Sequence, residues 1–165
     1  MRHLRLLLAT ASAVLLVGVS TGTVLSQDED QYLTGTLTFS EDIDPGTYTE
    51  LEGRDEVRGA SAAYNLRMSD PRVSGVLTTA DIALDGYTGE RIAFDGTAEL
   101  VSEEGAWAGN WTGVFEPMMG WQILSKLEGQ GVLEGLTAYL HGASPEIGDG
   151  VWEMEGFVVG EPPAE

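Results

Sequence analysis

The sequence predicts an all-β protein folded as an eight-stranded antiparallel up-and-down barrel. Three observations predict this fold. Glycine recurs every few residues, and each glycine inside a helix costs about 1 kcal/mol relative to alanine. Between the glycines, Thr, Val, Tyr, Trp and Phe alternate with polar residues, which is the two-residue period of a strand. Brief turns separate these segments, and closure into a barrel removes unpaired edges. A two-sheet β-sandwich is the alternative.

Residues 1–26 have the layout of a secretory signal peptide. Arg2 and Arg5 precede an uncharged, mostly apolar run at Leu6–Val19, and small or polar residues follow as far as Ser26. The run is shorter than the roughly 20 apolar residues that a membrane span needs. We therefore expect cleavage after Ser26, a secreted (extracellular or periplasmic) protein, and no stable membrane insertion after cleavage. An uncleaved N-terminal anchor is the alternative.

The remaining chain is expected to form one barrel domain. An acidic N-terminal segment, residues 27–59, holds a first strand at Tyr32–Phe39 and a long, turn-rich loop at Glu41–Gly59. Residues 60–160 supply the rest of the barrel, and residues 161–165 form a loose tail. The alternation predicts seven further strands at Ala60–Met68, Val73–Leu84, Arg91–Val101, Ala106–Phe115, Gln122–Gly129, Val132–His141 and Val151–Val159.

Turn-forming residues separate these strands at the expected places. In chain order, the turn segments are Asp44-Pro45-Gly46, Asp70-Pro71, Asp85-Gly86, Glu104-Gly105, Pro117, Gly129-Gln130-Gly131 and Gly148-Asp149-Gly150.

Several glycines fall on the apolar face of their strands. Gly96 shares a face with Phe94, and Gly113 shares a face with Trp111 and Phe115. Glycine otherwise weakens a strand, so its recurrence on this face needs a geometric reason. A small eight-stranded barrel has little interior volume. Alternation of glycine with bulky residues therefore predicts sharply curved walls and interlocking aromatic rings.

Composition excludes several classes of protein. The chain has 165 residues, with 8 Lys+Arg against 27 Asp+Glu and no Cys. Without cysteine, disulfides, thiolate metal sites and thiol nucleophiles are excluded. After removal of residues 1–26, six basic and 27 acidic residues remain, a net charge of −21. Such a surface repels phosphates, so we expect neither nucleic acid nor an anionic membrane as a partner.

Three stretches carry a resemblance to known proteins: Ser69–Gly75 (SDPRVSG), Gly105–Gly113 (GAWAGNWTG) and Leu127–Leu136 (LEGQGVLEGL). Together they resemble uncharacterised bacterial exported β-barrel proteins and, more loosely, the barrel shared by allene oxide cyclases and dirigent proteins. The resemblance covers roughly residues 60–160, and its motifs concern fold more than function. It implies an apolar cavity and a hydrophobic small ligand. No catalytic motif of either family is present, so no catalytic residue is transferred.

The sequence offers few side chains of the kinds that carry out catalysis or bind metal ions. His141 is the single histidine after residue 26, and no G-x-S-x-G pattern accompanies it. It lies in phase with Tyr139 at the end of a strand, so we expect it at a barrel mouth; an ordinary loop histidine is the alternative. Zinc would need several His or Cys ligands, and the acidic clusters do not follow the EF-hand pattern. No metal, cofactor or catalytic residue is therefore assigned.

Aromatic residues are the main candidates for binding. They fall on the expected inner face, where they form either a stacking pocket for an apolar ligand or simply the barrel core. On the expected strand at Val132–His141, Tyr139 shares this inner face with Leu133 and Gly135. The predicted ligand-binding residues are Tyr64, Trp107, Trp111, Tyr139, His141 and Trp152.

The leading hypothesis is an exported, acidic, non-catalytic barrel that binds a small apolar molecule or another surface component. One alternative is a cyclase or isomerase that acts on an apolar substrate, assisted by His141 or a carboxylate. A second is a filled, purely structural or interaction barrel. A cavity of at least about 300 Å³ lined by Trp111 and Trp152 would favour ligand binding.

Overall fold

The structure is a computed structural model, and it describes residues 32–87, 91–144 and 150–161. Within these residues the chain forms strands joined by short turns and two single turns of 3-10 helix. The strands are β1 (Tyr32–Asp44), β2 (Thr47–Leu51), β3 (Arg54–Met68), β4 (Gly75–Tyr87), β5 (Arg91–Ser102), β6 (Ala106–Glu116), β7 (Gly120–Gln130), β8 (Leu136–Ser144) and β9 (Val151–Gly160). The 3-10 turns are η1 (Pro71–Val73) and η2 (Gly131–Leu133).

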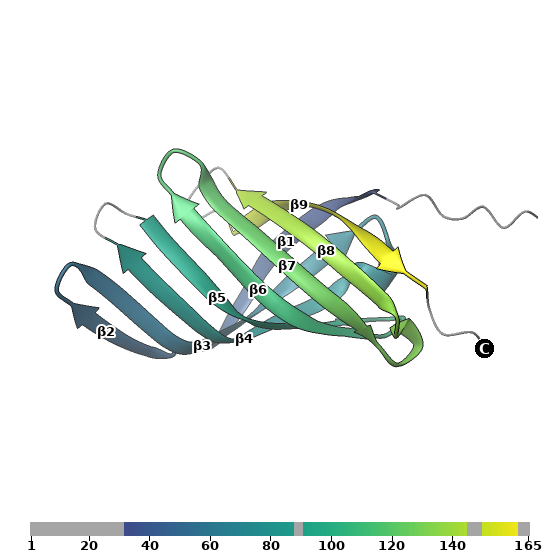
Figure 1. The fold of residues 1–165 in the computed structure, drawn as a ribbon, viewed down its shortest axis with the longest axis horizontal. Helices are drawn as coiled ribbons and strands as arrows, with labels where there is room; N and C mark the ends of the chain where they lie inside the picture. The colour runs from purple at the N-terminus through teal and green to yellow at the C-terminus, as the bar shows by residue number, and fades with distance from the viewer. Residues whose placement is uncertain (1–31, 88–90, 145–149, 162–165) are drawn as a thin grey trace, which may run out of the picture.

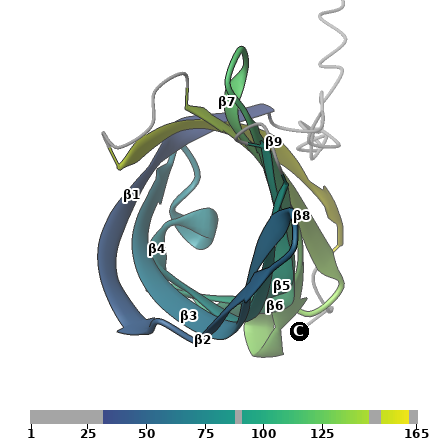
Figure 2. The same cartoon turned by 90° about the vertical axis from the view of Figure 1, so that its left-hand side faces the viewer.

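Eight of these strands close into an antiparallel up-and-down barrel (Figure 1). From β3 to β9, each strand pairs with the next strand along the chain. β1 then pairs with β9 on one side and with β3 on the other, which completes the ring seen end-on in Figure 2. The predicted fold class is confirmed, and the sandwich alternative is wrong.

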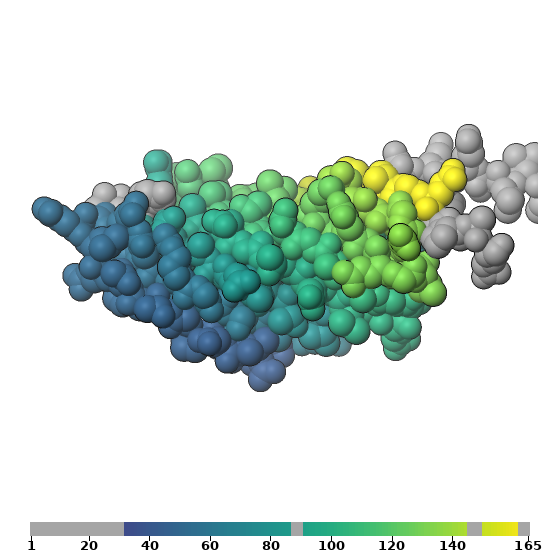
Figure 3. All heavy atoms as spheres, turned by 60° about the horizontal axis from the view of Figure 1, so that its bottom comes forward, coloured from purple at the N-terminus to yellow at the C-terminus, as the bar shows by residue number. Residues whose placement is uncertain are grey.

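The segment predicted as a long loop, Glu41–Gly59, forms a β-hairpin instead. β1 continues to Asp44, is interrupted at Pro45-Gly46, and resumes as β2, which pairs with the start of β3. Proline has no N–H to give to the ladder, and Gly46 has a φ of +72°, so the two residues break the strand without ending the hairpin. Among the described strands, β2 pairs with β3 alone and stands outside the closed ring. The β2–β3 hairpin projects at one tip of the molecule (Figure 3).

The strand predicted at Val132–His141 begins later and in the opposite phase. Residues 131–133 form η2, and Gly135 follows in the left-handed region with a φ of +86°. β8 therefore starts at Leu136, and its even-numbered residues face inward, including Leu136, Ala138 and Leu140 at 4%, 0% and 3% exposure. The prediction that Tyr139 and His141 face the interior is wrong.

Inside the barrel, glycine lies opposite bulky side chains, as predicted. Gly113 pairs with Phe94 across β5 and β6, and Gly129 pairs with Trp107 across β6 and β7. A Cβ added to Gly113 would lie 2.5 Å from the Cζ atom of Phe94, much closer than van der Waals contact allows. The absence of a side chain at Gly113 thus makes room for the facing ring.

One end of the barrel is closed by the two 3-10 turns. Figure 2 shows η1 lying within the ring of strands, and its Val73 side chain is completely buried. The Trp107 indole N–H donates to the Arg72 carbonyl oxygen at 2.7 Å and so ties η1 to β6. On the other side of this end, the Leu133 side chain of η2 is 5% exposed and joins the same core.

Asp70 organises the turn that enters η1. Its Oδ1 atom accepts a hydrogen bond from the Arg72 backbone N–H at 2.8 Å, and its Oδ2 atom accepts one from the Arg72 guanidinium at 2.6 Å. The carboxylate is 5% exposed, so these charge-assisted bonds replace its lost hydration.

The predicted signal peptide, residues 1–26, and residues 162–165 of the predicted tail lie outside the described residues. In the described part of the chain, no helix has the length and hydrophobicity needed to cross a membrane.

Candidate functional site

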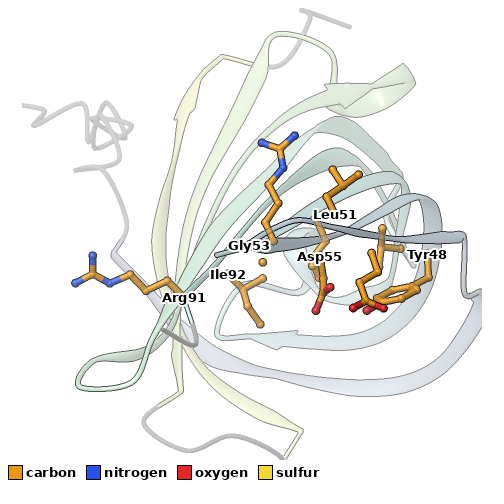
Figure 4. Close-up of a pocket in the computed structure, with 11 residues that line it drawn as sticks. Tyr48, Leu51, Gly53, Asp55, Arg91 and Ile92 are labelled. Atoms are coloured by element: carbon orange, nitrogen blue, oxygen red, sulfur yellow. The ribbon is translucent and has the colours of Figure 1, made fainter. Parts of the chain in front are cut away.

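The barrel is hollowed at the end opposite η1 and η2. A hollow of about 600 Å³ lies against the β2–β3 hairpin and the neighbouring parts of β4 and β5 (Figure 4). Its apolar lining includes Val57, Leu84 and Ile92. Leu84 pairs with Phe94, and Ile92 pairs with Phe115. The lining of the hollow is therefore the direct continuation of the inner face of the barrel.

A chain of aromatic rings runs from this region through the barrel interior. Trp121 lies between Phe115 and Phe94, with centroid distances of 5.1 and 5.8 Å. Phe94 leads to Trp111 at 6.0 Å, and Trp111 leads to Tyr64 at 5.4 Å. Such distances and tilted geometries are those of favourable aromatic contacts. Phe115, Phe94 and Trp111 are buried, at 4%, 8% and 3% exposure.

Tyr64 contacts three other aromatic rings, of which Trp111 is the first. Its ring also contacts Phe39 and Trp152, each at 5.8 Å and close to perpendicular. Burial, with a smaller contribution from the Asp42 carboxylate, raises the pKa of the Tyr64 phenol above 10.0. The indole nitrogen of Trp152 is buried and has no hydrogen-bond partner among the described residues. The predicted trio of Tyr64, Trp111 and Trp152 is therefore brought together.

The other predicted binding residues lie elsewhere. Trp107 faces inward but belongs to the closed end, where it holds η1. Tyr139 is 38% exposed on the outer wall and stacks on Phe157 with a centroid distance of 5.2 Å. His141 also lies on the outer wall, so the predicted mouth position for this histidine is wrong.

His141 is part of a row of polar side chains across the outer faces of β1, β9, β8 and β7. Its Nδ1 atom lies 3.1 Å from Glu155 Oε1, and its Nε2 atom lies 3.0 Å from Gln122 Oε1. Glu155 also accepts a hydrogen bond from the Tyr32 hydroxyl. The Tyr32 hydrogen bond, followed by that from His141, lowers the pKa of Glu155 below 4.5. An outer hollow of about 600 Å³ beside this row is lined by Thr, Arg, Glu and His side chains, without aromatic rings.

Acidic side chains accompany the apolar lining of the open-end hollow. Glu50 and Asp55 face each other directly across the β2–β3 hairpin, and both line the hollow. The Tyr48 hydroxyl hydrogen-bonds the Asp55 carboxylate, which raises the pKa of Tyr48 above 10.0. Figure 4 shows Tyr48 and Asp55 together within the outline of the barrel, whereas Arg91 points away from it.

Metal ligands do not come together in the described part of the chain. No group of three or more His, Cys, Asp or Glu side chains is placed there to hold an ion. Two facing carboxylates supply fewer oxygen ligands than the six to eight that Ca²⁺ takes.

Sequence reasoning missed the β2–β3 contribution to the site, because the acidic composition of residues 41–59 resembled a loop. Two local signs were present. Thr47–Leu51 alternates in the manner of a strand, and Gly53 is placed to close a two-residue turn with Glu52. Gly53 has a φ of +85°, which is typical of such hairpin turns.

Comparison with known proteins gives no relative from which a function can be carried over: no family model matches the chain, and no curated protein or solved structure is similar to it.

Proposed function

We propose that this protein is a non-catalytic binding barrel that takes up a small apolar, ring-bearing molecule at its open end. The observation that carries the proposal is the continuity of the site. The hollow is lined by Val57, Leu84 and Ile92, and these residues share the inner sheet face with the chain of rings, because Leu84 pairs with Phe94 and Ile92 pairs with Phe115. An apolar lining with a few convergent polar groups is typical of small-molecule sites.

Two further observations favour binding at this end. The opposite end is filled by the buried Val73 and Leu133 side chains of η1 and η2, so the hollow lies at the end that these turns leave uncovered. The enzymatic alternative called for His141 or a carboxylate; His141 lies outside the hollow on the outer wall, and the carboxylates that line the hollow, Glu50 and Asp55, belong to exposed residues. The hollow differs from the cavity expected from sequence, since residues of β2 to β5 line it instead of Trp111 and Trp152.

Export from the cytoplasm is part of the proposal. It rests on the basic start and the apolar run of residues 1–26. An excess of acidic over basic residues also suits a protein that must stay soluble and avoid anionic surfaces.

The binding proposal is tested with N-phenyl-1-naphthylamine, a neutral probe that fluoresces in apolar sites. We expect saturable binding to the wild-type protein and weaker binding to Val57→Trp, because the larger Trp side chain takes up part of the apolar region of the hollow. Val76→Trp is the matched control, since Val76 is 49% exposed on the outer wall away from the open end. Circular dichroism verifies that both variants fold. Absence of saturable probe binding to the wild type, or equal binding by folded Val57→Trp, would contradict the proposal.

A further inference from the structure

The charges around the open end are sorted between the two faces of the sheet. Glu50, Asp55, Gly86 and Ile92 are successive partners across β2, β3, β4 and β5. Ile92 pairs with Phe115, which is 4% exposed in the interior. Directly paired residues share a face of the sheet, so the carboxylates of Glu50 and Asp55 belong to the concave face that continues the barrel interior.

The nearby arginines are paired with acids on the opposite, outer face. Arg54 forms an ion pair with Glu56, two residues further along the same strand. Arg58 lies 3.4 Å from Glu56 and 2.6 Å from Asp85. On β5, Arg91 is oriented by Glu116 at 3.8 Å. Although Arg54 and Arg91 contribute to the lining of the hollow, their guanidinium groups are therefore engaged with outer-face acids.

Glu50 and Asp55 have no ion-pair partner among the described residues. Like charges placed directly opposite each other in an antiparallel pair destabilise it. The Tyr48 hydroxyl hydrogen-bonds Asp55 and leaves the net charge of the carboxylate pair unchanged. The Tyr48 ring is 61% exposed beside them, and an aromatic face attracts organic cations. The polar part of the hollow is thus complementary to a positive charge.

We infer that the ligand of the open end is a cationic amphiphile, with an ammonium head between Glu50 and Asp55 and an apolar, ring-bearing body against Val57, Leu84 and Ile92. This inference rests on the proposed function and adds the chemical class of the ligand to it. A compact ammonium group with an apolar body matches both parts of the lining. The ammonium group also relieves the repulsion between the facing carboxylates of Glu50 and Asp55. A ligand of this class therefore uses the carboxylate pair and the apolar lining at the same time.

A pair of probes that share a naphthylmethyl body and carry either an ammonium or a neutral hydroxyl head tests the inference. Isothermal titration calorimetry at 0.15 M salt compares 2-naphthylmethylammonium with the neutral 2-naphthalenemethanol on the same protein. We expect the ammonium to bind several-fold more tightly. In the double variant Glu50→Gln, Asp55→Asn, this preference should disappear through a roughly three- to tenfold weakening for the ammonium, the range expected for exposed charge pairs. Affinity for the alcohol should be retained.

The control variant Glu99→Gln, Glu104→Gln removes the same two charges away from the hollow. Glu99 is exposed on β5, and Glu104 lies in the β5–β6 turn at the closed end. The control variant should keep the preference for the ammonium, because it loses the same net charge as the test variant but retains the carboxylates of Glu50 and Asp55 in the hollow. Equal binding of the two probes to the wild type, or equal loss of preference in both variants, would overturn the inference and leave the proposed function standing. Failure of both probes to bind would overturn the proposed function and the inference with it.

Discussion

Gly113 lies directly opposite Phe94 across the β5–β6 pair, and the edge of the Phe94 ring occupies the space that a side chain at Gly113 would need. The contact belongs to the aromatic chain, because Phe94 also touches Trp111 and Trp121. A methyl group at position 113 must therefore displace a buried ring that is held from two sides, and it also meets the Gln122 carbonyl oxygen of β7 well inside van der Waals contact.

We expect Gly113→Ala to lower the free energy of unfolding by between about 1 and 3 kcal/mol, which is typical of overpacked cores. Urea unfolding followed by tryptophan fluorescence measures the change. Gly86→Ala is the matched control, since a Cβ at Gly86 would meet its nearest atom, the Asp55 carbonyl oxygen, at an ordinary 3.5 Å. Equal stability of Gly113→Ala and the wild type would show that the ring can move aside.

Trp107→Phe should loosen the closed end of the barrel. The substitution removes the indole N–H that donates to the Arg72 carbonyl oxygen at 2.7 Å and leaves a small gap in the core. The expected loss of stability is about 1 to 3 kcal/mol. Hydrogen exchange of the Val73 amide, which bonds the Asp70 carbonyl oxygen, should become faster. Trp121→Phe, at the open end, should leave that exchange rate unchanged; a similar acceleration there would argue against a local role for Trp107.

Asp70 should make the closed end sensitive to acid. Burial raises the pKa of this carboxyl group, but hydrogen bonds from the side chain and backbone of Arg72 outweigh it, so the pKa lies below its ordinary 3.8. A lowered pKa means that the ionised carboxylate stabilises the fold above pH 3.8, and that this contribution is lost as the pH falls towards the lower value.

Asp70→Asn should therefore reduce the free energy of unfolding by about 1 to 2 kcal/mol near neutral pH. The difference from the wild type should shrink as the pH falls below about 4. Denaturant unfolding at a series of pH values measures it, with the exposed Glu99→Gln as a control. A difference that stays constant down to pH 2 would mean that the charge of Asp70 does not contribute.

On the outer wall, Tyr32 should govern the titration of Glu155. The Tyr32 hydroxyl makes the largest contribution to the lowered pKa of this carboxylate, ahead of His141. Tyr32→Phe should thus raise the Glu155 pKa towards 4.5, while probe binding at the open end stays unchanged. Carboxyl NMR titration measures the pKa, and Tyr139→Phe serves as the control. If His141→Asn raised the Glu155 pKa more than Tyr32→Phe does, the prediction that Tyr32 contributes most would be contradicted.

The predicted signal peptide leads to a simple mass measurement. When the full chain is expressed in a bacterium with a general secretion pathway, the exported protein should begin at Gln27. A Ser26→Arg variant should block processing, because the cleavage site requires a small residue. Intact mass spectrometry distinguishes the two forms. Recovery of wild-type protein starting at Met1 in the membrane fraction would support the anchor alternative.

The central part of the barrel was predictable because its local pattern and its packing agree. From β5 through β6, every inward position from Ile92 to Leu100 and from Trp107 to Phe115 holds an apolar residue or glycine, and glycines occur opposite rings. Phe94, Trp111 and Phe115 accordingly point inward as their phase predicts. Here the two-residue period of the strand is sufficient, since no bulge shifts the register between the two strands.

The parts that were missed depend on geometry that a local pattern does not carry. The 3-10 turn η2 and the left-handed Gly135 that follows it interrupt the predicted strand, so β8 starts in the opposite phase and Tyr139 and His141 lie on the outside. In the β2–β3 hairpin, acidic composition hid a strand whose partner lies across a two-residue turn. The open-end hollow was missed for the same reason, because Glu50 and Asp55 meet only once that hairpin is formed.

The pairing of β2 on one side only affects how a ligand would enter and leave the hollow. Since β2 has a neighbour only in β3 among the described strands, no described strand pairs with its other edge on one flank of the hollow. A molecule can approach from that flank as well as along the axis. Uptake and release then require no separation of the eight ring-closing strand pairs, so exchange can be fast even if the barrel itself unfolds very slowly.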